Sequence, residues 1–408
     1  MARGGHPIRA RWQAEAVSQH FPDPTPIMSR PGLYLARRGD GLCGGTRSDT
    51  RHAKVEILGI SQRGLALPLL LLTDAGKVDA RLPTVLIIAQ QHGNEPAGGE
   101  TALVLAQQLR VLIIPPGNLD GAEGFKRATA NGIDVNRDHL LLSSPEGRGY
   151  RPCNTQIQPQ VMLDLHEFTV AGRWVEKFGG VMRYDALLQP ATVGNLDAQI
   201  AAHAQRDYVD RIHAALAAHG LTSFAYHTTS AVTSQGKIVS MGGVQPDTGR
   251  NVGGLRPAIS LLVEVRGVGI GRAHFLRRVH TQLLAASTVI ETAAAQGSGL
   301  MRLIADREAY VTRGACRGDL VIEAHLTPRL QRLTFLDAAT GQELPTDVDW
   351  RAASPLEVIR SRPRPCGYLI GGDQTLPIER LRPLGVKLHK VVRQNRWQHP
   401  GAALVTRA

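Results

Sequence analysis

Two residues that can bind a metal ion, His92 and Glu95, are three positions apart and follow a short apolar run. That run, Val85 to Ala89, is a continuous series of β-prone residues, as expected for a central strand covered on both faces. Pro96 is well suited to the first position of a helix. The pair is therefore predicted on a strand-to-helix turn at the carboxyl edge of a sheet, where open α/β folds place their sites. There the two side chains can bind one metal ion, although for such a pair alone polar loop residues without a ligand are the commoner outcome.

The loop from Phe125 to His139 carries a second group of polar residues. It contains Arg127, Asp134, Asn136 and Arg137, and loops of this kind beside a sheet edge commonly form binding sites. The guanidinium group of an arginine is a planar fork that can hold a carboxylate or a developing oxyanion. For either arginine taken alone, a solvated surface position is the commoner outcome.

A buried strand is predicted from Gln160 to Phe168, and it contains Asp164 and His166. Side chains in a strand alternate between its two faces, so these two residues lie on the same side. A histidine beside an acid is a good metal ligand with a local hydrogen-bond partner. Taken alone, a histidine satisfied within the core or at its rim remains the commoner outcome.

The apolar segment from Ser260 to Gly267 is predicted to be another strand, and Glu264 is its anomaly. A carboxylate among apolar neighbours is costly to bury unless it is paired or functional. The structural alternative is an ion pair with Arg266, which shares the same face of the strand.

The rest of the pattern predicts the elements that must hold these residues. Two strands joined by a turn are expected at 54–60 and 65–73, and a buried strand parallel to the first apolar run is expected at 111–115. Helices are expected at 197–219 and 272–295, the second ending at 296–299, and short strands at 320–324, 330–336 and 343–350. The chain is accordingly divided into an irregular N-terminal extension (1–52), a large α/β domain (53–296) and a small β-rich C-terminal domain (300–408).

Composition limits the possible classes of protein. The chain has 408 residues, 43% of them hydrophobic and only 4% aromatic, so it can build a large and mainly aliphatic core. The net charge is +12, but 40 of the 47 basic residues are Arg spread along the chain. This favours a compositional bias over a nucleic-acid-binding face, although basic residues are in local excess after Arg360. No apolar run is long enough for a membrane span.

The four cysteines, Cys43, Cys153, Cys316 and Cys366, show no paired spacing typical of a zinc knuckle. Cys316 and Cys366 either form a disulfide or are free thiols. The first residues lack the apolar core of a signal peptide, so the chain as written is expected to be cytoplasmic. Its compartment and its oligomeric state are left open.

Together the four motifs resemble those of the zinc metallocarboxypeptidase family, in a bacterial branch of the carboxypeptidase A-like peptidases. In chain order they are His92-Gly-Asn-Glu95, Asp134-Val-Asn136-Arg137, Asp164-Leu-His166 and Glu264-Val-Arg266. The resemblance covers about 54–295 and implies an α/β/α sandwich around a mixed eight-stranded sheet. Members of this family are often exported.

Carried over to this chain, the resemblance implies that His92, Glu95 and His166 hold one Zn²⁺ ion per chain. Asp134 would orient His92, and Glu264 would be the general base that takes a proton from the attacking water. Arg127 would stabilise the oxyanion. Asn136 and Arg137 would bind the terminal carboxylate of a peptide or peptide-like substrate.

The chain also departs from the family's pattern. The connections at 109–111 and 147–160 are short, and Leu119 stands where the family commonly has Pro. No tyrosine lies between Tyr226 and Glu264, where many carboxypeptidases carry a tyrosine that caps the substrate. Arg250 is the suggested substitute.

Two alternatives stay open. One is a deacylase of N-acyl amino acids, similar to aspartoacylase and succinylglutamate desuccinylase, whose relatives share the first three motifs but not the Glu264-Val-Arg266-Gly267 pattern. The other is a non-catalytic binding protein, either a decayed form of this fold or a protein that binds an anionic surface through its basic C-terminal stretch. Metal content together with turnover separates these alternatives.

Overall fold

The computed structural model describes residues 53–72, 81–108, 112–150, 157–230, 236–390 and 403–405. The predicted N-terminal extension and the short connection at 109–111 lie outside the described residues. So do Cys43, Cys153 and most of the second short connection.

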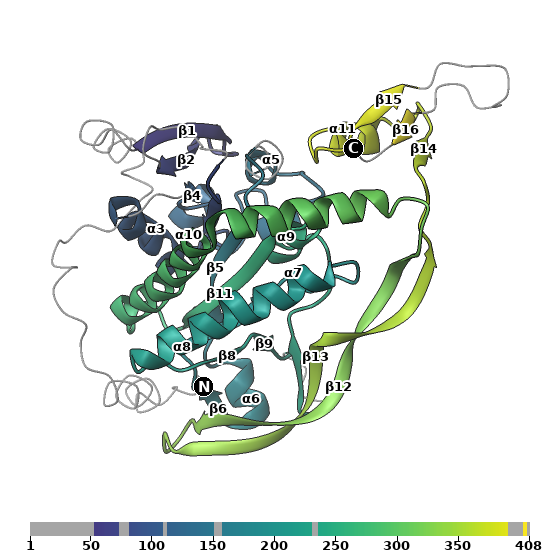
Figure 1. Ribbon diagram of the computed structural model, residues 1–408. Coiled ribbons are helices and arrows are strands. Elements are labelled where there is room, and N and C mark those ends of the chain that lie inside the picture. Colours follow the sequence, from purple (N-terminus) through teal and green to yellow (C-terminus); the bar gives the residue numbers. More distant parts are fainter. Residues whose placement is uncertain are drawn as a thin grey trace, which may run out of the picture.

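The described residues contain an eight-stranded mixed sheet in the order β1-β2-β4-β3-β5-β11-β7-β8 (Figure 1). Strands β4, β3, β5 and β11 are parallel neighbours. Strand β2 is antiparallel to β1 and β4, β7 is antiparallel to β11, and β8 is parallel to β7. The strands are β1 (Ala53–Ile60), β2 (Ala66–Leu72), β3 (Val85–Ala89), β4 (Leu112–Ile114), β5 (Val161–Thr169), β7 (Ala186–Pro190), β8 (Ser223–Ala225) and β11 (Ile259–Val268). The predicted mixed eight-stranded sheet is confirmed.

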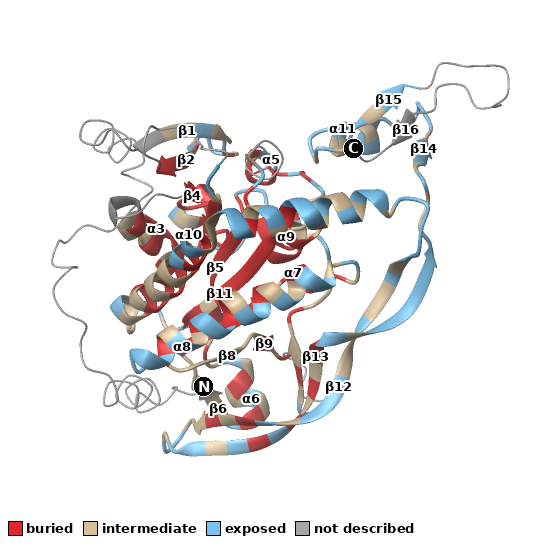
Figure 2. Cartoon of the chain, viewed as in Figure 1, coloured by how far each residue is buried: buried red, intermediate tan, exposed pale blue. Residues whose placement is uncertain are grey.

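The two faces of this sheet are buried by different groups of residues, as the two-residue period of a strand requires. Ile87 and Leu163 belong to the larger core cluster, which includes residues of helices α3 (Pro96–Gln108), α8 (Asp210–Ala218) and α10 (Phe275–Arg313). Leu86 and Met162 point to the other face, where the buried ring of Tyr150 joins the cluster. Strand β3 is buried along its whole length, as its unalternating sequence predicted (Figure 2).

Further short helices surround the sheet. They are α4 (Leu119–Glu123), a 3-10 turn (Val135–Arg137), α5 (Pro145–Gly149), α6 (Arg173–Phe178), α7 (Ala198–His203), a π-helical stretch (Ala204–Val209) and α9 (Gly249–Gly254). The helix expected at 197–219 is thus three consecutive helical segments. Within the described residues, no helix is long and apolar enough to cross a membrane.

The predicted helix end at 296–299 coincides with an interruption of helix α10 at Gly297. Gly297 has a φ of 45° and kinks the helix, but the helix continues to Arg313. Beyond the kink, Leu300 and Ile304 are buried in the larger core cluster. Their burial explains why helical structure resumes after a segment rich in glycine.

The C-terminal strands are longer than predicted. Strand β12 (Asp319–Asp337) merges two predicted short strands, and β13 (Glu343–Pro363) extends well beyond the third. A turn at 338–340 joins them. Much of this hairpin is exposed, as its pale blue colour in Figure 2 shows.

The hairpin is part of a second sheet, in the order β6-β12-β13-β10-β9. The strands β6 (Gly180–Met182), β9 (His227–Thr228) and β10 (Ile238–Met241) come from the region predicted as the large domain. Phe335 and Trp350 of the hairpin share a buried cluster with Trp174 and Phe178 of α6. The half of the hairpin nearest its turn therefore packs against that region, and a separate C-terminal domain stays a prediction.

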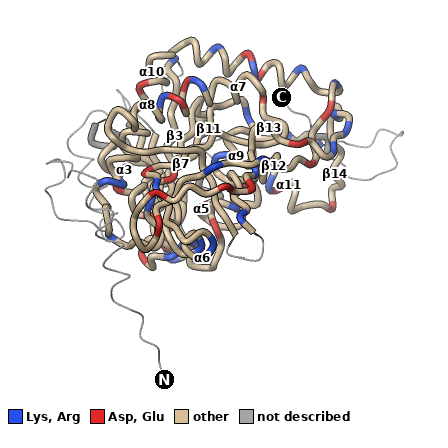
Figure 3. Tube along the Cα trace, turned by 90° about the horizontal axis from the view of Figure 1, so that it is seen from below, with Lys and Arg blue, Asp and Glu red and all other residues tan. Residues whose placement is uncertain are grey.

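The last described elements are β14 (Tyr368–Ile370), α11 (Thr375–Leu381), β15 (Leu388–Lys390) and β16 (Ala403–Val405), whose three strands form a third small sheet. Cys316 and Cys366 form a disulfide, which settles the choice that the sequence left open. Seen from below, acidic and basic residues are interspersed along the described chain (Figure 3).

Candidate active site

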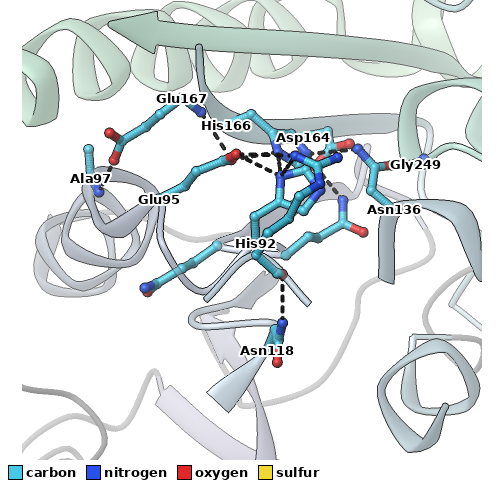
Figure 4. A network of polar contacts seen from close by, with 12 residues as sticks. His92, Glu95, Ala97, Asn118, Asn136, Asp164, His166, Glu167 and Gly249 are labelled. Atoms are coloured by element: carbon cyan, nitrogen blue, oxygen red, sulfur yellow. Dashed lines mark hydrogen bonds and ion pairs between the residues drawn. The ribbon is translucent and has the colours of Figure 1, made fainter. Parts of the chain in front are cut away.

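His92 and Glu95 follow the carboxyl end of β3 and come together with His166, which lies within β5 (Figure 4). The Nδ1 atom of His92 lies 2.7 Å from Glu95 Oε1, and Nδ1 of His166 lies 2.8 Å from Glu95 Oε2. The two Nδ1 atoms are 3.1 Å apart. All three side chains are buried, so three atoms with lone pairs converge on one point.

The charges of these three groups depend on one another. Burial alone would raise the pKa of Glu95, but His92 and His166 lower it well below its ordinary value. Burial alone would lower the pKa of His166, but the carboxylates of Asp164 and Glu95 raise it well above its ordinary value. A cation in the centre would take over the role that a proton on the imidazole otherwise has.

Each histidine turns its second ring nitrogen to an acid. His92 Nε2 lies 3.2 Å from Asp134 Oδ1, and His166 Nε2 lies 2.9 Å from Asp164 Oδ1. This arrangement fixes the orientation of a ligand imidazole and leaves Nδ1 to bind the metal ion. Both acids were expected beside their histidines.

Asp164 is itself held by a residue that sequence reasoning missed. Gln91 donates from Nε2 to Asp164 Oδ1 over 2.5 Å, and its Oε1 lies 2.6 Å from Nε2 of His139. All three side chains are buried. The position of Gln91 directly before His92 was the only signal in the sequence.

Arg127 lies at the edge of the cluster. It donates from Nε and Nη2 to Asp134 Oδ2 over 3.0 and 2.9 Å, and its Nη1 is 3.2 Å from His92 Nδ1. Its Nη1 is also 3.8 Å from Glu95 Oε1. The side chain is 48% exposed, so it can contact a substrate while Asp134 fixes its direction.

Asn136 and Arg137 follow Asp134 in the 3-10 turn, whose first backbone amides Asp134 caps. Asn136 is buried, accepts a hydrogen bond from the backbone of Gly249 over 2.7 Å and places Nδ2 3.2 Å from His166 Nε2. Arg137 is exposed and donates to the carbonyl of Asn136. The predicted pair is thus split between a buried and an exposed side chain.

Glu264 in β11 pairs in register with His166 in the neighbouring parallel strand β5. Burial raises the pKa of its carboxyl group to about 7, and the charges of His166 and Glu95 also act on it. The alternative ion pair with Arg266 is not formed among the described residues, since the Nη2 atom of Arg266 donates to the carbonyl of Met182. Glu264 therefore borders the metal-binding cluster as a carboxyl group without a cationic partner in its own strand.

Tyr226 and Arg250 also border this space. Burial raises the pKa of the Tyr226 phenol, and Glu264 raises it further, whereas Arg250 lowers it. Arg250 was expected near the substrate. Tyr226 was noted in the sequence only as the last tyrosine before Glu264, and the structure brings it within electrostatic reach of both residues.

Comparisons with known proteins find carboxypeptidases among the similar chains. No model of a known protein family matches the chain. Carboxypeptidase 2 of Trichophyton rubrum is 27% identical over 400 residues, which cover 90% of this chain and 74% of that protein. Carboxypeptidase 2 of Trichophyton equinum is 26% identical over 401 residues, with coverage of 90% and 74%. Among solved structures, a metallo-carboxypeptidase from Burkholderia cenocepacia is 18% identical with a TM-score of 0.48, covering 64% of this chain and 69% of that one.

Proposed function

We propose that the chain is a zinc carboxypeptidase that removes the C-terminal residue of a peptide or peptide-like amide. The observation that supports this most directly is the convergence of His92, Glu95 and His166 on one point beside Glu264. Two imidazoles and one carboxylate are the ligand set of a catalytic zinc site with an open position. We propose one Zn²⁺ ion held by these three residues.

When bound, zinc would polarise the scissile carbonyl and make water a better nucleophile. The chain's own residues must supply the proton transfers. Glu264 is suited to this, because a carboxyl group with a pKa near 7 can both accept and release a proton near neutral pH. We assign it the role of general base toward water and of general acid toward the leaving amine.

Arg127 is proposed to stabilise the oxyanion that develops on the scissile carbonyl. Its two hydrogen bonds to Asp134 hold the guanidinium plane in place, and Nη1 points to the metal-binding cluster. A preorganised donor of this kind contributes about 3 to 4 kcal/mol to transition-state stabilisation. Asp134 then has two roles, since the same carboxylate orients His92.

Asn136 and Arg137 are proposed to bind the free C-terminal carboxylate of the substrate. Arg137 is exposed and its planar fork fits a carboxylate, while the buried amide of Asn136 is held by Gly249. A clamp of this type makes hydrolysis depend on a free chain end.

The test is hydrolysis of N-blocked dipeptides that carry either a free or an amidated C-terminus, beside a panel of N-acyl amino acids. The proposal expects cleavage of the free dipeptides with release of the terminal amino acid, and little cleavage of the amides. Cleavage confined to N-acyl amino acids would instead support the deacylase. Absence of all turnover in zinc-loaded protein would contradict both and favour a binding protein.

A further inference from the structure

Arg250 in α9 is a buried cation in the wall of the proposed active site. It is only 6% exposed, and its Nη2 atom donates to the carbonyl of Gly243 over 2.7 Å. Its Nε atom is buried and has no hydrogen-bond partner among the described residues. Within the described residues, no carboxylate forms an ion pair with Arg250. A guanidinium group in this state is costly to bury, so a missing anionic partner is the simplest physical explanation.

The position of Arg250 is fixed by the loop that it contacts. Asn251 donates to the carbonyls of Gly243 and Gln245, and the side chain of Gln189 bonds both the amide and the carbonyl of Gly242. A Cβ atom on Gly242 would lie 2.5 Å from Arg250 Nη2, so the glycine leaves the room that the guanidinium occupies. The arginine is thus held in place by this loop.

The charged groups around Arg250 show which part of the molecule its guanidinium group faces. The charged and phenolic groups that act on Arg250 are Tyr226, Asp164, Glu264 and Arg137. Asp164 contacts His166 and Gln91 through Oδ1, and among the described residues it forms no ion pair with Arg250, while Glu264 is assigned to proton transfer. Arg250 therefore lies within electrostatic reach of both Glu264 and a second positive group, Arg137.

We propose that Arg250 binds the side-chain carboxylate of an acidic C-terminal residue, while Arg137 binds the terminal carboxylate. The preferred substrate is then a peptide or peptide-like amide that ends in glutamate or aspartate. This inference rests on the proposed carboxypeptidase function. Two guanidinium forks fit two carboxylates of one amino acid better than they fit one carboxylate together with an apolar side chain.

The size of the preference follows from the burial of the cation. Losing the partner of a buried charge costs enough to reduce kcat/KM by roughly 30-fold or more. Glutamate and glutamine have nearly the same shape, so a Glu-ended and a Gln-ended dipeptide with the same N-blocked residue isolate the charge. Wild-type, zinc-loaded protein is expected to prefer the Glu-ended dipeptide by at least this factor.

The Arg250→Gln variant is expected to lose this preference, whereas Arg250→Lys keeps part of it because the charge remains. Arg137→Gln should weaken hydrolysis of both dipeptides and leave their ratio close to that of the wild type. Arg206→Gln, which removes an exposed arginine paired with Asp207, is the matched control. It should change neither the hydrolysis of the two dipeptides nor their ratio. Thermal unfolding of each variant identifies any that fail to fold.

A measurement on the wild type keeps the inference testable if Arg250 variants misfold. Free glutamate, as a reaction product, should inhibit the wild-type enzyme more strongly than free glutamine by a similar factor. Equal hydrolysis of the Glu-ended and Gln-ended dipeptides, together with equal inhibition by glutamate and glutamine, would overturn the acidic preference. The carboxypeptidase function would still stand. Equal losses on both dipeptides in Arg250→Gln would likewise overturn the acidic preference, because the arginine would then bind the terminal carboxylate. No hydrolysis of any free dipeptide would contradict the proposed function itself.

Discussion

Glu264 and His166 occupy paired positions on two adjacent parallel strands, β11 and β5. One residue belongs to the metal-binding cluster and the other is the carboxyl group proposed to move protons. Because both are fixed by the same strand pairing, their relative position does not depend on a loop. The sheet itself thus sets the distance between the proposed base and the metal-binding cluster.

The two acids that orient the ligand histidines, Asp134 and Asp164, are predicted to control metal affinity. Asp134→Asn or Asp164→Asn removes the carboxylate that orients a ligand histidine, and each should weaken zinc binding about 10- to 100-fold. Competition with a chromogenic chelator measures this. Asp207→Asn is the matched control, because Asp207 lies away from the cluster. Its carboxylate pairs with His203 over 3.0 Å. Unchanged zinc affinity in both site variants would refute the proposed orienting role.

Glu264→Gln is predicted to stabilise the metal-free protein at high pH. Burial raises the pKa of Glu264 from 4.5 to about 7, so between these values the folded state binds more protons than the unfolded chain. Stability from this group therefore falls as the pH rises through that window, by up to about 3 kcal/mol. Removing the charge should make the variant more stable than wild type at pH 8 and equally stable near pH 4.5.

Urea unfolding of both chelator-treated proteins at the two pH values tests the Glu264 prediction. A stability difference that is the same at both pH values would show that the carboxyl group is not perturbed in this way.

Gly93→Ala is predicted to damage the turn that carries His92 and Glu95. A Cβ atom at Gly93 would lie 1.9 Å from the backbone carbon of Gly121, so one of the two backbone segments must move. We expect a loss of at least about 2 kcal/mol in unfolding free energy and a clear drop in zinc affinity. Gly299→Ala is the control, since nothing lies within 4 Å of its Cβ position. Because alanine is favoured over glycine within a helix, Gly299→Ala should raise the unfolding free energy by about 0.5 to 1 kcal/mol.

The disulfide between Cys316 and Cys366 is predicted to stabilise the hairpin without affecting the site. It closes a loop with a sequence separation of 50 residues, and both cysteines are exposed. Loop-closure entropy gives a contribution of up to about 4 kcal/mol. The double Cys→Ser variant should unfold at lower urea concentration yet bind zinc as the wild type does. A large loss of zinc affinity in that variant would show that the hairpin and the site are coupled.

The parts of the fold that could be predicted are those with a local signal. The unalternating run of β3, the proline that opens α3 and the buried run of β5 each identify an element from a few adjacent residues. Because the metal-binding residues lie at the ends of these elements, they could be placed from the sequence as well. The disulfide was left as one of two choices, since pairing needs the distance between distant segments.

The parts that could not be predicted depend on contacts between distant segments. Strand β12 pairs with β6, and β13 with β10, over more than a hundred residues of sequence, and no local pattern specifies such partners. The same holds for Gln91, whose role depends on Asp164 and His139. At Gly297 the local signal for a helix end coincides with the kink, but the helical segment beyond it, where Leu300 is buried, was not predicted.

The most direct test of the account measures zinc by mass spectrometry in wild type and Glu264→Gln purified without added metal, together with hydrolysis of free-ended dipeptides. The account predicts about one zinc ion per chain in both proteins and loss of hydrolysis by several orders of magnitude only in the variant, because Glu264 moves the proton but does not hold the metal. Wild-type protein that binds no zinc, or a Glu264→Gln variant that cleaves as fast as the wild type, would contradict it.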